Sequence, residues 1–381
     1  MIKLKEGSVG HWLIRALWVA AVVAVVVYVP TKTQPGTIGD ITTAIELAIA
    51  AMSLNLVLGY AGVISIGHSA FFGIGGYTTA ILVTRYGWSQ GWTLFVAAAV
   101  AFVIGCVIAM PALRLKGIYL ALVTLALAVL FPTLMKWDKL TWLTGGPEGL
   151  SGFGYDDLPT WPILGELRGR EGRAVYSYWL AVVLIVVCYL VCRGIVKSRV
   201  GRSLIAMRDN ETAAAVMGVH RALTKTVVFG ISAAMCALAG SAAAVRLNLA
   251  NPDIRFVTLL GSITFLLIMV LGGAATLWGP IIGAFAYVLL DTRTREAGVQ
   301  EEGIVSTVFG DWLNIQGSPA TLVLAILIMI VIFVAPFGLV GLFKRLAHRF
   351  VVIVPRPAGS PQATHMLAAE APSEVEEAPT S

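Results

Sequence analysis

Residues 175–192 read VYSYWLAVVLIVVCYLVC, 18 consecutive positions without a charged side chain. A helix of this length rises about 27 Å, close to the hydrocarbon thickness of a membrane, which is about 30 Å. Residues 226–245 form a second run of the same kind. The whole chain is 58% hydrophobic and 13% charged, with a mean hydropathy of +0.85. We therefore predict an all-α fold, a polytopic membrane helical bundle.

The loop between these two runs, residues 193–225, is strongly basic. It holds seven Lys or Arg side chains against two acidic ones. A surplus of basic residues beside membrane spans marks the cytoplasmic side. We therefore place this loop in the cytoplasm.

Within this loop lies the polar stretch 201–219 (GRSLIAMRDNETAAAVMGV), and its second half predicts a short helix of about two turns. Asp209 or Asn210 can cap its N-terminus, because either side chain can accept hydrogen bonds from free amides of the first turn. Glu211 follows at a position where the helix dipole favours an anion. Gly218 is placed to end the helix in a left-handed conformation. The two flanking spans would hold this helix against the inner membrane face.

The remaining apolar runs bring the predicted number of transmembrane helices to about ten. The other eight are residues 16–29, 41–58, 63–83, 92–113, 118–135 and 319–343, with two more inside 256–290. The run 256–290 breaks at the turn-forming residues 272–280. For the glycine-rich run 63–83, a re-entrant segment is the alternative to a full span. Both termini are predicted to be cytoplasmic.

Charge and composition divide the chain into parts around one membrane domain, residues 12–350. Residues 1–11 are a cytoplasmic N-terminus, and the loops 136–174 and 291–318 lack a basic surplus, so we predict them to be external. Residues 351–381 form a tail rich in Pro, Ala and Glu, which we predict to be disordered because such a composition cannot bury a core.

Glu46 is the only charged side chain in the span predicted for residues 41–58. A carboxylate at the centre of a span costs about 2.5 to 3.5 kcal/mol on insertion scales. Such a group is a candidate for a transport pathway. The alternative is that Glu46 lies near the headgroups and is solvated.

Residues 58–77 (LGYAGVISIGHSAFFGIGGY) contain six glycines, among them Gly67 and Gly73. Glycine is unfavourable within a helix, so these residues indicate either close helix packing or a broken helix that lines a pathway. His68 and Ser69 are polar groups inside this stretch. We take all four as candidate pathway residues together with Glu46, with a structural hydrogen-bonding role for His68 as the alternative.

Several classes of function are excluded by what the sequence lacks. No G-x-x-x-x-G-K-[ST] motif is present, so this subunit is not predicted to hydrolyse nucleotide. The basic residues are spread over short loops rather than one stripe, which argues against nucleic-acid binding. The four cysteines lie in apolar runs without a nearby His or third thiol, so no metal site is predicted. No set of catalytic groups converges, which argues against an enzyme. An ion-coupled secondary transporter or channel remains as an alternative, with Glu46 and His68 as its ionisable groups.

Five stretches resemble the permease of branched-chain amino acid ABC importers, the LivM type. They are NLVLGYAGVISIGHSAFFGIGGYTTAIL (55–82), RLKGIYLALVTLALA (114–128), GGPEGLSG (145–152), GRSLIAMRDNETAAAVMGV (201–219) and VLGGAATLWGPIIGA (270–284). The resemblance runs from the second predicted span to the last. Relatives of this family carry urea, short amides or sugars, so these substrates remain open.

The resemblance implies a multi-pass permease of the bacterial inner membrane that works with partners. These are a homologous LivH-type permease, two cytoplasmic ATPases that bind ATP and Mg, an external substrate-binding protein, and membrane lipid. It implies no cofactor in this subunit. The family's cytoplasmic Glu-Ala-Ala…Gly motif is similar to residues 211–218, so it implies contact with the ATPases there. The expected coupling residues are Arg208, Asp209, Asn210, Glu211, Ala213, Ala214 and Gly218.

Overall fold

The computed structural model describes residues 2–5, 20, 24–30, 32–112, 118–153, 169–299, 325–326, 329–330, 333, 338–342 and 351–354. The chain divides into two compact units. One unit combines Met1–Tyr28 with Lys344–Ser381, and the other is Val29–Phe343.

The first unit contains one pair of strands. β1 (Ile2–Lys5) and β4 (Val351–Val354) are parallel, with Ile2 opposite Val351. Residues 351–354 are thus a strand where the sequence predicted the start of a disordered tail. Their sequence, VVIV, consists of β-branched residues, which favour extended backbone. The rest of the predicted tail lies outside the described residues.

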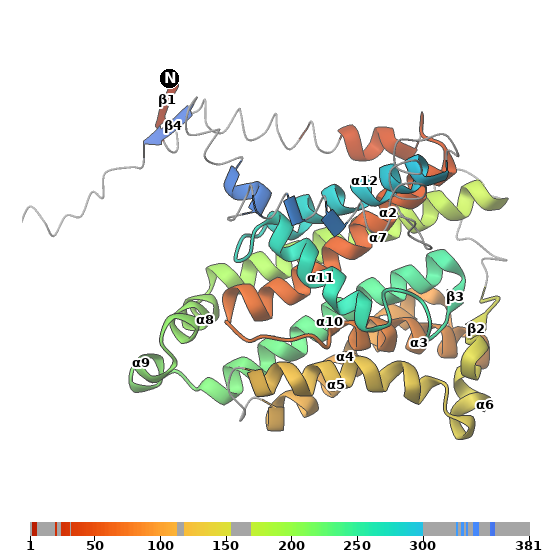
Figure 1. Ribbon diagram of the computed structural model, residues 1–381, viewed down its shortest axis with the longest axis horizontal. Coiled ribbons are helices and arrows are strands. Elements are labelled where there is room, and N and C mark those ends of the chain that lie inside the picture. Colours follow the sequence, from red (N-terminus) through yellow and green to blue (C-terminus); the bar gives the residue numbers. More distant parts are fainter. Residues whose placement is uncertain are drawn as a thin grey trace, which may run out of the picture. The chain divides into compact units, whose positions relative to one another are not determined.

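The second unit is mainly helical (Figure 1). Its elements in chain order are α2 (Pro35–Leu54), the π-helix η1 (Asn55–Tyr60), α3 (His68–Tyr86), α4 (Gln90–Ala112), α5 (Ile118–Met135), the 3-10 helix η2 (Asp138–Leu140), α6 (Thr141–Thr144), the 3-10 helix η3 (Gly146–Glu148), β2 (Leu150–Ser151), α7 (Gly169–Lys197), α8 (Arg199–Asp209), α9 (Glu211–Val216), α10 (Arg221–Leu247), β3 (Leu249–Ala250), α11 (Leu259–Gly272) and α12 (Gly279–Val299).

Helix α10 is central to this unit and packs against α2, α3 and α4, while α2 also contacts α7 and α12. Small residues allow the close approach of α3 and α10. A Cβ atom at Gly75 would overlap the carbonyl oxygen of Ala237, and one at Gly240 would overlap that of Phe72. Close helix packing, one of the two predicted reasons for the glycines of residues 58–77, is therefore confirmed for Gly75.

Among the described residues, four helices are long and apolar enough to cross a membrane. They are Pro35–Tyr60, Gln90–Met110, Glu171–Lys197 and Arg221–Leu247. A fifth follows if Tyr119–Met135 and Asp138–Thr144, which meet at 64°, are one broken span. The protein is therefore a multi-pass membrane helical bundle, while the total of ten spans and the cytoplasmic location of both termini stay predictions.

Several boundaries differ from those expected. Residues 61–67 are irregular and α3 begins at His68, so the run predicted as a span from residue 63 is only partly helical. Helices α7 and α12 extend into the predicted loops 136–174 and 291–318, because charged side chains near a membrane surface are compatible with continued helix. Most of the last predicted span, 319–343, lies outside the described residues.

The break predicted within residues 256–290 is confirmed. Helix α11 ends at Gly272 and α12 begins at Gly279. With 14 residues, α11 rises only about 21 Å, less than a membrane of about 30 Å. The turn between the two helices must therefore be supported by other parts of the protein.

Figure 1 shows α8 and α9 at one end of this unit and α6, β2 and β3 at the opposite end. At that opposite end Leu150 pairs with Ala250 in a two-stranded antiparallel sheet. The side-chain Nδ2 of Asn251 donates hydrogen bonds to the backbone carbonyls of Pro147 and Glu148, at 3.1 and 3.0 Å. These bonds fix the GGPEG turn onto the connection between α10 and α11.

Candidate functional site

The loop 193–225, which is predicted to be cytoplasmic, contains two helices, each with a side-chain cap. The Ser198 hydroxyl accepts a hydrogen bond from the backbone amide of Val200 at 3.1 Å and caps the N-terminus of α8. This helix was not predicted from the sequence. The Asn210 side chain accepts the amides of Thr212 and Ala213 at 3.1 and 3.0 Å and starts α9. Asn210, rather than Asp209, is therefore the cap, and such a cap contributes about 0.5 to 2 kcal/mol.

Gly218 ends α9 as predicted. Its φ is +86°, and its amide donates to the carbonyl of Ala215 at 3.0 Å. The amide of Val219 reaches back to the carbonyl of Ala214 at 3.1 Å. These two bonds form a Schellman motif, which requires a residue that tolerates positive φ. Both predicted ends of this helix are confirmed.

Ion pairs attach α9 to the start of α10. Glu211 lies 3.0 Å from the ammonium of Lys225 and 3.8 Å from the guanidinium of Arg221. As the first residue of α9, Glu211 also meets the positive end of the helix dipole. A displacement of α9 would therefore act directly on the end of the span formed by α10.

Apolar side chains are exposed at the far end of α9. Val216 and Met217 keep 83% and 84% of their surface exposed. We call these two residues the α9 tip. Ala214, in contrast, is buried against the rest of the protein and Ala213 is exposed. Exposed apolar groups on a polar segment between two spans indicate an interaction site.

Arg208 points back into the protein. Its Nη1 donates to the carbonyl of Gly59 at 3.0 Å, and its Nη2 lies 3.2 Å from a carboxylate oxygen of Asp209. Gly59 belongs to η1, at the end of the first described span. Arg208 thus contacts the end of the span Pro35–Tyr60, whereas Glu211 contacts the start of α10.

Glu46 is paired with Arg246 and is not solvated. The guanidinium donates Nε to both carboxylate oxygens, at 2.9 and 3.1 Å, and Nη2 to one of them at 2.9 Å. The Glu46 side chain is 2% exposed and that of Arg246 is 17% exposed. This bidentate pair joins α2 to the last turn of α10.

A cavity of about 710 Å³ lies beside this pair. Its walls include Gly36 and Gly39 of α2, Arg173 of α7, and Arg246 with Asn248 at the end of α10. Among the described residues, no atom outside the neighbouring backbone lies within 4 Å of a Cβ atom built at either glycine, so no described residue fills the space at this end of α2.

His68 is buried, and both of its ring nitrogens have partners. Nδ1 lies 3.1 Å from the hydroxyl of Ser65, and Nε2 lies 2.7 Å from that of Ser232 on α10. The Ser232 hydroxyl donates to the carbonyl of Ser53 on α2 at 2.6 Å. These bonds connect α2, α3 and α10, which favours the structural role of His68.

The other candidate pathway residues of this stretch also make packing contacts. The amide of Ser69 donates to the hydroxyl of Ser262 on α11 at 2.9 Å. A Cβ atom at Gly67 would lie 2.6 Å from the carbonyl oxygen of Thr124, and one at Gly73 would overlap the ring of Phe131. The structure thus brings Gly67, His68, Ser69 and Gly73 together around α3, while Glu46 pairs with Arg246.

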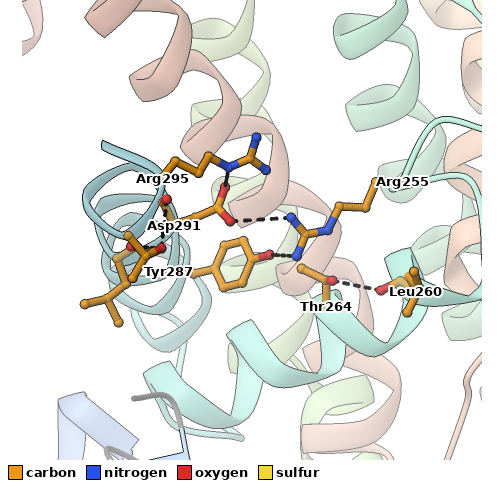
Figure 2. Close-up of polar contacts among 8 residues, drawn as sticks. Arg255, Leu260, Thr264, Tyr287, Asp291 and Arg295 are labelled. Atoms are coloured by element: carbon orange, nitrogen blue, oxygen red, sulfur yellow. Dashed lines mark hydrogen bonds and ion pairs between the residues drawn. The ribbon is translucent and has the colours of Figure 1, made fainter. Parts of the chain in front are cut away.

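A further polar cluster, which the sequence analysis missed, holds α12 (Figure 2). Arg255 donates Nη2 to the hydroxyl of Tyr287 at 2.7 Å, and its Nη1 lies 3.4 Å from Asp291. Arg295, one turn further along α12, lies 2.9 Å from the other oxygen of Asp291. The cluster attaches the connection before α11 to the last turns of α12.

Two other residues were missed although the sequence carried a signal for each. Arg246 directly follows the apolar run 226–245, so its charge could have been matched with that of Glu46. Asn55 is an amide inside the apolar sequence around Gly59. Its side chain accepts the amide of Ala275 at 2.8 Å and donates to the carbonyl of Thr276 at 2.9 Å.

Apolar spans, small-residue helix packing and a capped helix in the basic loop between two spans define a multi-pass membrane protein. A family profile described as branched-chain amino acid transport system, permease component, matches residues 36–335. The chain belongs to this family and is a permease component. The resemblance inferred from the sequence motifs is therefore confirmed.

Individual relatives agree with this assignment. The chain is 30% identical over 302 residues to the high-affinity branched-chain amino acid transport system permease protein LivM of Escherichia coli (strain K12), across 75% of this chain and 70% of the relative. It is 24% identical over 280 residues to a probable LivM of Methanocaldococcus jannaschii, across 64% and 76%. The fructose import permease protein FrcC of Rhizobium meliloti is 27% identical over 136 residues, across 35% and 38%. No solved structure matches.

Proposed function

We propose that this chain is the transmembrane permease subunit of an ABC importer for branched-chain amino acids. The observation that carries the proposal is a capped helix with an exposed apolar tip, held between two spans, in a chain of this permease family. An external binding protein delivers the substrate, and two separate ATPase subunits, which bind ATP and Mg, drive its movement. A homologous LivH-type permease completes the membrane part, in the inner membrane of a bacterium.

The mechanism follows from how α9 is attached. ATPase subunits that close on ATP push the α9 tip, and the Glu211 ion pairs transmit the displacement to α10. The spans then tilt as rigid bodies and open the pathway alternately to each side. The coupling residues proposed are Arg208, Asp209, Asn210, Glu211, Ala213, Ala214 and Gly218. Glu46, Gly67, His68, Ser69 and Gly73 stay a prediction as pathway residues.

Sugar import is the second candidate, since one relative is a fructose permease. That similarity covers 35% of this chain, whereas the LivM similarity covers 75%, so branched-chain amino acids are favoured. An ion-coupled transporter is less well supported, because Glu46 is occupied by Arg246 and both His68 nitrogens are bonded.

Affinity purification from mildly solubilised membranes tests the proposal. We expect the tagged chain to co-purify with a second permease and with ATPases that carry a P-loop. The double variant Val216→Asp/Met217→Asp should lose the ATPases but still insert, because it places charges on the exposed α9 tip without touching the core. Recovery of the chain alone, with leucine uptake that follows an ion gradient and ignores ATP, would overturn the proposal.

Gly218→Val should leave insertion intact and lower leucine uptake per ATP hydrolysed. The residue has a φ of +86°, which a β-branched side chain adopts at a cost of about 1 to 3 kcal/mol. In the part of the chain that the structure describes, no further atom lies within 4 Å of its Cβ position, so the effect comes from the lost cap rather than from a clash. Gly194→Ala on α7, also in open space, is the control. Normal uptake by the valine variant at normal expression would contradict this role.

A further inference from the structure

The first described span ends in a π-helical turn instead of continuing as an α-helix. Helix α2 passes into η1 at Asn55, and residues 61–67 after it are irregular. Short π-helical segments within helices are rare and often occur at functional sites. The last carbonyls of any helix lack partners inside the helix. In η1 the carbonyl of Gly59 is one that accepts a hydrogen bond from elsewhere in the chain, from Arg208 at 3.0 Å.

Arg208 fits closely against this turn. Besides the bond to Gly59, its side-chain stem covers Gly62, where an added Cβ atom would lie 2.7 Å from Cγ of Arg208. Gly62 has a φ of +69°, which favours glycine at this position. Asp209 holds the other side of the guanidinium at 3.2 Å. The side chain is only 35% exposed although it lies on a cytoplasmic helix.

The π-helix η1 is also bonded to the turn between α11 and α12. The side-chain Oδ1 of Asn55 accepts a hydrogen bond from the backbone amide of Ala275 at 2.8 Å. Its Nδ2 donates to the carbonyl of Thr276 at 2.9 Å. Ala275 has a positive φ of +56°, and its amide would lie 2.7 Å from a Cβ atom at Gly59. The backbone of η1 therefore lies directly against this turn.

We infer that Arg208 and Asn55 form one mechanical link, in which η1 transmits movement of α8 to the turn that begins α12. Arg208 is a positioning residue that acts on the protein's own membrane part, and the α9 tip contacts the ATPases. This inference rests on the proposed function. It adds a second route for displacement, through η1 to α12, beside the route through Glu211 to α10.

The test measures coupling rather than activity alone. The full importer, purified through this chain, is reconstituted in lipid vesicles, and leucine uptake per ATP hydrolysed is measured per inserted molecule. We expect Arg208→Ala to lower this ratio about tenfold, with the ATPases still co-purifying. Arg208→Lys keeps the charge and the stem but has no planar fork, so it should be intermediate. Arg202→Ala, at an exposed position of the same helix, should match the wild type.

A double-mutant cycle with Asn55→Ala decides whether the two residues act together. If they belong to one link, either single substitution already breaks it. The uptake per ATP hydrolysed of the double variant is then no lower than that of the single variant with the lower value. An unchanged ratio in Arg208→Ala, or single losses that multiply in the double variant, would overturn the inference. If the alanine variant does not insert, Arg208→Lys decides, and a wild-type ratio there also overturns it. Absence of ATPases from the wild-type complex would instead refute the proposed function.

Discussion

Glu46→Leu is expected to destabilise the folded protein by about 3 kcal/mol. The variant removes the carboxylate that binds the Arg246 guanidinium at 2.9 Å and leaves a charge that cannot deprotonate in a mostly buried site. The effect should lie near the lower end for buried pairs, because 17% of the Arg246 side chain is exposed. The measurement is thermal unfolding of the purified protein in detergent, together with the amount that elutes as a single species.

The matched control removes both charges. Glu46→Leu/Arg246→Leu should recover most of the lost stability, because an apolar pair of similar volume can replace a buried ion pair without net cost. A single variant as stable as the wild type would show that Arg246 does not depend on Glu46. Recovery of stability without recovery of uptake would assign the pair to the transport pathway.

Gly75→Ala should lower the free energy of unfolding by at least about 3 kcal/mol, so that little folded protein is recovered. The added methyl would overlap the carbonyl oxygen of Ala237, and this atom belongs to the backbone of α10 and has no rotamer to change. Helices α3 and α10 would have to separate along their whole contact. The same result is expected for Gly240→Ala, which meets the backbone of Phe72 from the other side.

Gly39→Ala is the control for this prediction. It makes the same chemical change inside a membrane helix, but no described residue outside the neighbouring helix backbone comes within 4 Å of the new methyl. Its stability should stay equal or rise by up to about 1 kcal/mol, since alanine is the better helix former. Detergent-solubilised protein and thermal unfolding again provide the measurement. Equal stability of the Gly75 and Gly39 variants would contradict close packing of α3 on α10.

Features that depend on neighbouring residues could be predicted from the sequence. The apolar runs around residues 175–192 and 226–245, the cap at Asn210, the end at Gly218 and the break after Gly272 all follow from local chemistry. The glycines of residues 58–77 predicted either close helix packing or a broken helix, and close packing is what the structure shows at Gly75. Helix α8 was not predicted, although Ser198 is a suitable N-cap residue at its start.

Features that depend on distant partners could not be predicted in this way. Arg208 donates a hydrogen bond to Gly59, which is 149 positions away in the sequence. Glu46 looked isolated because its partner, Arg246, is 200 positions away. No residue pattern distinguishes the π-helical turn at Asn55 from ordinary helix, because its bonds are set by packing against the turn at Ala275.

The burial of the native thiols has a practical consequence. Cys188, Cys192 and Cys236 are buried and Cys106 is partly covered within α4, so each of the four lies in an apolar helix. A maleimide that cannot cross lipid reacts with thiolates in water and does not reach such groups. We therefore expect the chain with its native cysteines to give no labelling signal with such a maleimide. A single cysteine placed at an exposed site would report which side of the bilayer that site occupies.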